Sequence, residues 1–183
     1  ELSQLQAEAP AMGWPFVKRR MRAELGPGWQ EKFAGFEKDA AHAASLGQVH
    51  RATLHDGRQV ACKLQYPDMA SAVEADLKQL QMLFSLHRRM SPAIDTREIA
   101  KEISARVREE LDYAREAAHI AVYQGILGDF DRIRVPEVIP ELSTKRLLTM
   151  GWLTGKPLLD YKEHSQDERN LLARTMFHAW WHP

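Results

Sequence analysis

The chain has 183 residues, 44% of them hydrophobic and 27% charged, a composition typical of one folded domain with a sizeable core. Its 25 basic and 25 acidic residues balance, so net charge gives no reason to expect nucleic acid as a partner. Cys62 is the only cysteine, which excludes an intrachain disulfide, and no apolar run reaches the roughly 20 residues of a membrane span.

The first 34 residues predict two short amphipathic helices, interrupted between Pro10 and Pro15. A basic run at residues 18–20, followed by Arg22, lies in the second helix. Such a run is either a site for a polyanion or, more commonly, the solvated face of a helix.

A β-hairpin is predicted next, from two short strands at Val49–Leu54 and Gln59–Gln65. Asp56 and Gly57 lie between them, and Asp-Gly between two such runs is a strong hairpin signal. Pro67 ends the second strand because proline cannot continue the ladder of hydrogen bonds.

Two helices are predicted over residues 68–90 and 96–124, with Asp95 or Thr96 as the cap of the second. Apolar residues recur at steps of three and four in both: Val73, Leu77, Leu80 and Phe84, then Ile99, Ile103, Val107, Leu111 and Ala114. We expect both apolar faces to join the core, with a lipid- or partner-binding surface as the alternative.

Two more strands, Arg134–Val138 and Arg146–Trp152, and a last helix over about 166–181 complete the prediction. The order of helices, hairpin, two helices, two strands and helix indicates an α+β fold.

Small residues fill the stretch 40–50, where Gly47 directly precedes a predicted strand. Small side chains let a backbone approach a phosphate closely, although an Ala-rich stretch is also typical of a helix or of tight packing. On the strand after the hairpin, period two puts Ala61 and Lys63 on one face and Cys62 on the other. Alanine leaves room for a flat base and lysine reaches a phosphate, as in the Val-Ala-x-Lys strand of protein kinases.

An acidic stretch, 109–116, lies on the second predicted helix. It is either a solvated face or the source of the carboxylate that positions a phosphate-binding lysine in kinases. On an ideal helix Asp112 and Glu116 share a face, whereas Glu110 points nearly opposite to Asp112. Glu110 and Asp112 therefore make different contacts, or the helix is irregular there.

Together these stretches resemble the AarF/UbiB family of atypical protein-kinase-like proteins. Ala43–His50 matches its Ala-rich loop, Val60–Pro67 its Val-Ala-x-Lys-x-Gln-Tyr-Pro strand, and Glu110–Ala117 its Glu-x-Asp-Tyr-x-x-Glu-Ala helix. Shorter matches to Val-Pro-x-Val and Leu-Thr-Met segments occur at Val135–Val138 and Leu148–Met150.

The resemblance implies a kinase-like N-terminal lobe, a small antiparallel sheet with added helices, plus the start of the C-terminal lobe. The implied division is a helical extension at 1–35, the lobe at 36–153, and the hinge exit with the first helix of the next lobe at 154–183. The family's Lys-x-Gly-Gln motif is expected before Glu1, and its His-x-Asp and Asp-Phe-Gly-like segments beyond Pro183. We therefore expect a piece of a longer enzyme that is inactive alone.

The resemblance also implies roles for particular residues. Lys63 would contact the phosphates of ATP or ADP, with Glu116 as its partner. Mg²⁺ would bind with the nucleotide in the full-length protein, since no metal site is predicted in this chain. Glu110 and Asp112 would meet an N-terminal extension over the pocket. The other implied nucleotide-binding residues are Ala43, Ala44, Ser45, Gly47, Ala61, Met150 and Trp152, the last two in a hinge strand that reads the adenine edge.

The implied function is an ATP-dependent kinase or ATPase supporting ubiquinone biosynthesis, with quinone-pathway proteins or lipid as partners. The alternative is a scaffold that binds nucleotide or isoprenoid lipid without turnover. The implied location is cytoplasmic, with peripheral attachment to a bacterial inner membrane as the alternative.

The chain departs from the family pattern at three places: His42 stands where alanine is common, Asp39 or Ala40 where proline is usual, and Gly151 where glutamate is frequent.

Two further signals stay outside the resemblance. His178 and His182 have the spacing of metal ligands but no third ligand. Trp180 and Trp181 suit a membrane interface or burial against another lobe, and we expect self-association through their helix.

Overall fold

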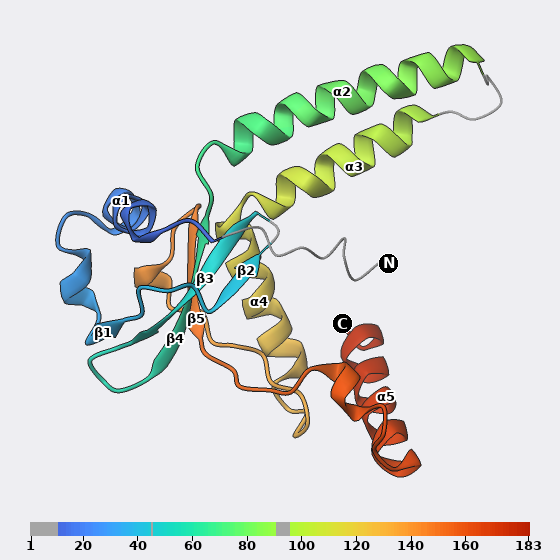
Figure 1. The fold of residues 1–183 in the computed structure, drawn as a ribbon. Helices are drawn as coiled ribbons and strands as arrows, with labels where there is room; N and C mark the ends of the chain where they lie inside the picture. The colour runs from blue at the N-terminus through green and yellow to red at the C-terminus, as the bar shows by residue number, and fades with distance from the viewer. Residues whose placement is uncertain (1–10, 45, 91–95) are drawn as a thin grey trace.

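A small antiparallel sheet organises the chain, with helices on both of its faces (Figure 1). The computed structural model describes residues 11–44, 46–90 and 96–183. The strands run in the order β1-β3-β4-β5, and β2 also pairs with β3. Their bounds are β1 Gly35–Phe36, β2 His42–Ala44, β3 Gly47–Thr53, β4 Gln59–Gln65 and β5 Leu147–Gly151. The predicted hairpin is confirmed as β3 and β4, with Gly57 at φ 87 in the turn.

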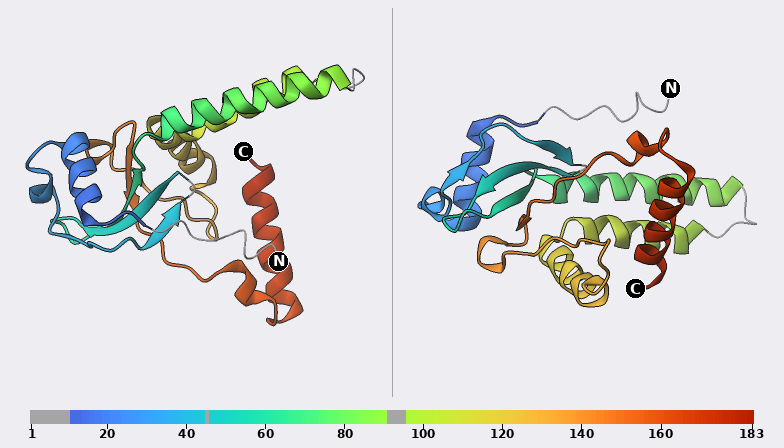
Figure 2. Two further views of the ribbon diagram at one scale, coloured as in Figure 1. Left: turned by 45° about the horizontal axis from the view of Figure 1, so that its top comes forward. Right: turned by 90° about the horizontal axis from the view of Figure 1, so that it is seen from below.

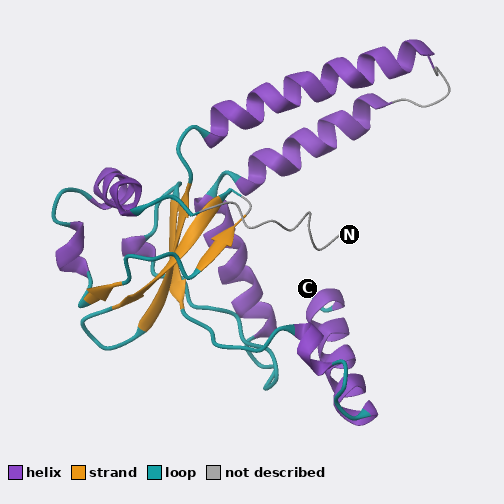
Figure 3. Cartoon of the chain, viewed as in Figure 1, coloured by secondary structure: helices purple, strands orange, loops and turns teal. Residues whose placement is uncertain are grey.

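The helices cover more of the described chain than the strands do (Figure 3). They are α1 Trp14–Leu25, α2 Met69–Met90, α3 Thr96–Glu110, α4 Tyr113–Leu127 and α5 Gln166–Trp181, with short 3₁₀ turns at Trp29–Lys32, Pro140–Leu142 and Leu158–Tyr161. None of the helices in the described ranges is long and apolar enough to cross a membrane. The α+β class predicted from the order of elements is confirmed.

The two faces of β4 have different neighbours. Val60, Cys62 and Leu64 are fully buried in the main core together with the apolar side of α1. The alternate residues Lys63 and Gln65 face α4 and Leu111, which lies two residues before the start of α4. Because side chains alternate along a strand, the core side of β4 and its functional side are built from successive residues.

The expected helical break between Pro10 and Pro15 fits the described residues, because residues 11–13 are not helical and α1 starts at Trp14. Pro15 lies in the first turn of α1, where its missing N–H would have no helical partner and its fixed φ suits the helix. Residues 1–10, which include the first expected helix, lie outside the described residues.

A hairpin of α2 and α3 projects away from the sheet (Figures 1 and 2). Ala100 and Ser104 form the buried strip of α3, whereas Ile99 is 48% exposed and Ile103 is 37% exposed. The expectation that the stripe containing these isoleucines joins the core is therefore wrong. Among the described residues α2 is the element that packs along this part of α3, so the small residues at their contact are covered and the larger neighbours are not.

The single helix expected over 96–124 is also wrong, because α3 ends at Glu110 and α4 starts at Tyr113. Asp112 has extended dihedral angles, and its carboxylate accepts hydrogen bonds from the backbone N–H groups of Ala114 and Arg115. A side chain that caps the next helix in this way competes with continued helix.

The strand expected over Arg134–Val138 is reduced to one bridge between Val138 and Met150. Proline lacks a backbone donor, and Pro136 and Pro140 flank this contact, so longer pairing along β5 is blocked. The strand expected over Arg146–Trp152 and the final helix are confirmed as β5 and α5.

Candidate functional site

Lys63 and Glu116 form an ion pair between the sheet and α4. The Lys63 Nζ donates to both carboxylate oxygens of Glu116, at 2.9 Å each. Lys63 lies on β4, which is hydrogen-bonded to strands on both sides, and Glu116 lies in the first turn of α4. The ammonium therefore has a fixed position with a carboxylate beside it, as sequence reasoning expected for this pair.

Tyr113 completes the surroundings of the lysine, and sequence reasoning did not single it out. Its ring lies 4.7 Å from the Lys63 Nζ, a distance at which an aromatic face attracts a cation. The side chain is 1% exposed, and its hydroxyl has no hydrogen-bond partner among the described residues. Burial, followed by the nearby Glu116 and Glu110 carboxylates, raises the pKa of Tyr113 well above its ordinary value. The available signal was its position three residues before Glu116, which is the same helix face.

Glu110 and Asp112 are separated by the break between α3 and α4. Glu110 is the last residue of α3 and lines the pocket beside Lys63. Asp112 caps α4, and the Lys145 ammonium lies 3.8 Å from its carboxylate. The acidic pair expected from the sequence therefore makes two different contacts.

A pocket of about 450 Å³ opens beside the ion pair. Its lining is rich in charge: Leu46, Lys63, Arg106, Glu109, Glu110, Tyr113, Arg115, Glu116 and His119. Glu109 holds two of the cations, since it accepts from Arg106 at 3.0 Å and from Arg115 at 2.9 Å. An anionic ligand entering here would meet three cations that are already oriented by carboxylates.

Part of the Ala-rich stretch forms β2, which pairs with β3, so the helical alternative is wrong there. Ala43 is exposed, Ala44 is half-buried, and Ser45 lies outside the described residues. Gly47 pairs with Gln65, and a Cβ at Gly47 would meet the Leu64 carbonyl and the Tyr113 hydroxyl. This close approach between β3 and β4 requires glycine.

The residues expected to hold the adenine lie along β4 and β5. Ala61 and Met150 are direct partners on these neighbouring strands. The Trp152 ring stacks on His42 with centroids 6.0 Å apart, and the Arg51 guanidinium lies 5.1 Å from the same indole. The backbone N–H of Trp152 donates to the Gln59 carbonyl at 2.9 Å, so this backbone donor already has a partner within the sheet. The hinge role stays a prediction.

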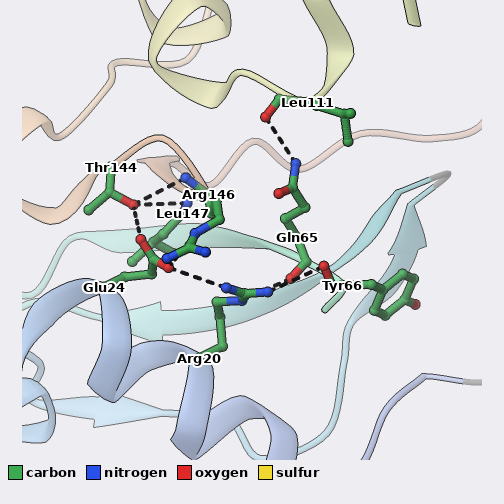
Figure 4. A network of polar contacts seen from close by, with 8 residues as sticks. All are labelled: Arg20, Glu24, Gln65, Tyr66, Leu111, Thr144, Arg146 and Leu147. Atoms are coloured by element: carbon green, nitrogen blue, oxygen red, sulfur yellow. Dashed lines mark hydrogen bonds and ion pairs between the residues drawn. The ribbon is translucent and has the colours of Figure 1, made fainter. Parts of the chain in front are cut away.

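The basic run of α1 divides between solvent and interior. Lys18 and Arg19 are exposed, as the solvated-face interpretation predicts. Arg20 turns inward, where it donates to the backbone carbonyls of Gln65 and Tyr66 (Figure 4).

The two histidines near the end of α5 both contact an aromatic ring. The centroids of His178 and His182 lie 6.4 Å and 4.9 Å from that of Phe130. In the part of the chain that the structure describes, no group of three or more His, Cys, Asp or Glu residues is arranged to hold a metal ion.

A central strand that carries a lysine, paired with a carboxylate from the helix beside the sheet, defines the N-terminal lobe of a protein-kinase-like protein. Residues 4–182 match the family described as ABC1 atypical kinase-like domain, and the chain belongs to this family. The resemblance recognised from Ala43–His50, Val60–Pro67 and Glu110–Ala117 is thereby confirmed.

Individual relatives agree with this assignment. The chain is 31% identical over 175 residues to "Atypical kinase COQ8, mitochondrial" of Saccharomyces cerevisiae, covering 96% of this chain and 35% of that protein. It is 33% identical over 177 residues to "AarF domain-containing protein kinase 1" of Xenopus tropicalis, covering 96% and 34%. The chain thus spans about a third of the length of these relatives.

A solved structure shares the fold. Rv3197 from Mycobacterium tuberculosis, determined in complex with erythromycin, superposes with a TM-score of 0.78 at 33% identity. The match covers 93% of this chain and 44% of that one. The kinase-like fold class expected from the sequence is confirmed.

Proposed function

We propose that this chain forms the ATP-binding N-terminal lobe of an atypical kinase or ATPase. The observation that carries the proposal is the Lys63–Glu116 ion pair, with 2.9 Å from Nζ to both oxygens, beside an open pocket of about 450 Å³. Preorganised positive charge at the place where phosphates bind is the main contribution that this kind of lobe makes to phosphoryl transfer.

Each element around the pair has a proposed part in binding the nucleotide. Lys63 neutralises phosphate charge while Glu116 fixes the lysine side chain in one orientation. Ala61 and its partner Met150 leave room for the flat base. Ala43 and Ala44 of β2 are proposed to extend over the phosphates together with Gly47, and Ser45 is proposed to lie beside them. Glu110 and Asp112 are proposed to meet an N-terminal extension, and Trp152 to lie at the base.

The donor set fits a nucleotide phosphate but not a divalent metal. Lys63 supplies a cation, whereas the described residues contain no group of carboxylates and histidines arranged for a metal. Mg²⁺ bound with ATP would neutralise phosphate charge, and we propose that ligands beyond residue 183 hold it. We also propose the division that the resemblance implies: 1–35 as the extension, 36–153 as the lobe, and 154–183 as the hinge exit and first helix of the next lobe.

The names of the relatives support a cellular setting. The name "Atypical kinase COQ8, mitochondrial" agrees with the AarF/UbiB resemblance, and we propose action in ubiquinone biosynthesis. The location proposed from the resemblance is the cytoplasm or the periphery of a bacterial inner membrane, whereas the name of that relative says mitochondrial. Proteins of that pathway, or a lipid, are the proposed partners.

A second candidate function is a scaffold that binds nucleotide or isoprenoid lipid without turnover. It is favoured by large apolar side chains on the outer side of α2, where Met82 is 68% exposed, Leu83 is 59% exposed and Leu86 is 54% exposed. The erythromycin bound to Rv3197 shows that a relative accepts a bulky amphiphile, so such compounds belong among the ligands to test.

ATP hydrolysis and thermal stability of the full-length protein, with and without ATP or ADP, separate the two functions. We expect nucleotide to raise the melting temperature of the wild type, and Lys63→Ala to abolish both this shift and hydrolysis. Lys101→Ala is the matched control, because Lys101 also faces a carboxylate, Glu98 at 4.0 Å, but lies outside the pocket. Stabilisation by nucleotide without hydrolysis would favour the scaffold, and no response to nucleotide would overturn the ATP site.

A further inference from the structure

Gln65 is a buried polar residue at the end of β4, and none of the roles assigned above uses it. It is 4% exposed and lies on the same face of the strand as Lys63, two residues away. Its side-chain Nε2 donates to the Leu111 carbonyl at 3.0 Å (Figure 4). This bond connects the strand that carries Lys63 to the short segment from which α4 begins.

Leu111 occupies the break between α3 and α4, where its carbonyl has lost its usual helical donor. In a continuous helix that donor would be the Arg115 N–H, which instead bonds to the Asp112 carboxylate at 3.3 Å. A buried or half-buried carbonyl without a donor costs free energy, and Gln65 supplies the donor. The break is therefore closed by a side chain from the sheet rather than by either helix.

Two backbone contacts beside this bond hold the start of α4. The Tyr113 N–H donates to the Lys145 carbonyl at 3.1 Å, and the Glu116 N–H donates to the Asp112 carbonyl at 3.1 Å. Glu116 lies five residues after Leu111, so its carboxylate follows any displacement of the break. The distance from Lys63 to Glu116 thus depends on where the first turn of α4 is held.

Gln65 is itself fixed from both sides of its own backbone (Figure 4). Its N–H donates to the Arg146 carbonyl at 3.1 Å, and its carbonyl accepts from the Arg20 Nε at 3.1 Å. Glu24, whose side chain is 6% exposed, accepts from Arg20 at 3.4 Å and from Arg146 at 2.9 Å. A residue held by α1 and by the start of β5 is a rigid support for a third element.

We propose that Gln65 is a positioning residue, which keeps the Lys63–Glu116 ion pair formed by holding the Leu111 carbonyl. The inference rests on the proposed function insofar as the ion pair serves the phosphates of ATP. It predicts that removing one amide group from the sheet loosens the first turn of α4 while the sheet itself stays intact.

Hydrogen exchange in the full-length protein tests the structural part without nucleotide. In Gln65→Met we expect amides 114–118 to exchange about tenfold faster than in the wild type, with the β3–β4 ladder unchanged. Gln124→Met is the matched control, because Gln124 also donates to a backbone carbonyl, that of Pro136 at 3.0 Å, from the far end of α4. Equal loosening by both variants, uniform loosening of the whole lobe, or no change would each contradict the proposal.

ATP affinity tests whether the effect passes through the ion pair. We expect Gln65→Met to weaken ATP binding several-fold in the wild type, yet less than about twofold in a Glu116→Gln background, because both changes remove the same arrangement. If Gln65→Met weakened ATP binding by the same factor in both backgrounds, the positioning role of Gln65 would be overturned. If Gln65→Met does not fold, Gln65→Asn keeps the amide but draws it back by one methylene, and a weaker form of the same pattern is expected. Faster exchange in Gln65→Met, together with a wild type that binds no ATP, would refute the proposed function while leaving the positioning role intact.

Discussion

Lys63 makes its contacts where the sheet, α4 and the pocket meet. Its ammonium faces the Glu116 carboxylate at 2.9 Å and the Tyr113 ring at 4.7 Å. Both neighbours attract the ammonium, and both lie in the first turn of α4. The ion pair at the centre of the site therefore depends on side chains from β4 and from the first turn of α4.

His50, a buried titratable residue, lies on the opposite face of the same hairpin from Lys63. Its Nδ1 must carry the proton, because it lies 3.0 Å from the Glu37 carbonyl, which can only accept. Its Nε2 then accepts from the Gln48 amide at 2.7 Å, and that amide also binds both backbone groups of Met12. A second proton on the imidazole would face a donor.

This arrangement makes stability depend on pH. Burial lowers the pKa of His50 below the ordinary 6.5, although the Glu37 carbonyl and the carboxylates of Asp39 and Glu37 oppose the shift. The unfolded chain therefore binds this proton first as pH falls, so stability is full above about pH 6.5 and decreases below it. Urea unfolding at about pH 7.5 and about pH 5.5 should show a smaller pH-dependent loss in His50→Gln than in the wild type.

His55→Gln is the control for this measurement. His55 is exposed, and its ring also bonds to a backbone carbonyl, that of Glu31 at 2.8 Å. We expect His50→Gln to change the pH-dependent loss more than His55→Gln does, because the imidazole of His50 is buried and that of His55 is exposed. An equal loss in His50→Gln and the wild type would contradict the assignment of the proton.

At the scale of elements, the cap of α4 is the feature most easily tested. Asp112→Ala removes the acceptor for two backbone N–H groups, and loss of such a cap costs about 1 kcal/mol of unfolding free energy. Asp112→Asn keeps an oxygen for the cap but removes the charge that faces Lys145 at 3.8 Å. Denaturant unfolding should therefore show a clear loss in Asp112→Ala and a small one in Asp112→Asn. Equal losses would mean that the ion pair, not the cap, stabilises this segment.

The hairpin and the break between α3 and α4 show why sequence predicts one element and not another. Asp56-Gly57 and the alternating residues of β3 and β4 are local signals, and the fold follows them. The apolar period continues across Leu111 and Asp112, so it gives no sign of the break. That break is fixed by the carboxylate of Asp112 and by Gln65 from 46 residues away, and only the tertiary structure shows the second contact.

The site divides in the same way. The pairing of Lys63 with Glu116 was expected from a kinase-like pattern, and the structure brings the two side chains together. Tyr113 and Gln65 were not singled out, because neither residue type signals phosphate chemistry by itself. Their importance follows from the face of the element on which each side chain lies. That face can be predicted only when the first and last residues of β4 and α4 are known.

At the scale of the whole molecule, α5 presents an apolar surface to solvent. Phe177 is 60% exposed, Trp180 is 79% exposed and Trp181 is 70% exposed. A contiguous patch of this kind favours association, so this chain should show a rising mass with concentration by light scattering. Trp180→Ser combined with Trp181→Ser should give a monomer at every concentration. A wild type that is strictly monomeric at high concentration would contradict this prediction.

The central claim is that the ammonium of Lys63, in the middle of a kinase-like sheet, binds the phosphates of a nucleotide. Calorimetric titration of ATP and of adenosine into the full-length protein, wild type and Lys63→Met, tests it most directly. We predict that the variant binds ATP at least about tenfold more weakly while its affinity for adenosine is unchanged, because only ATP carries the charge that Lys63 meets. Equal weakening of both ligands, or unchanged binding of ATP, would contradict the claim.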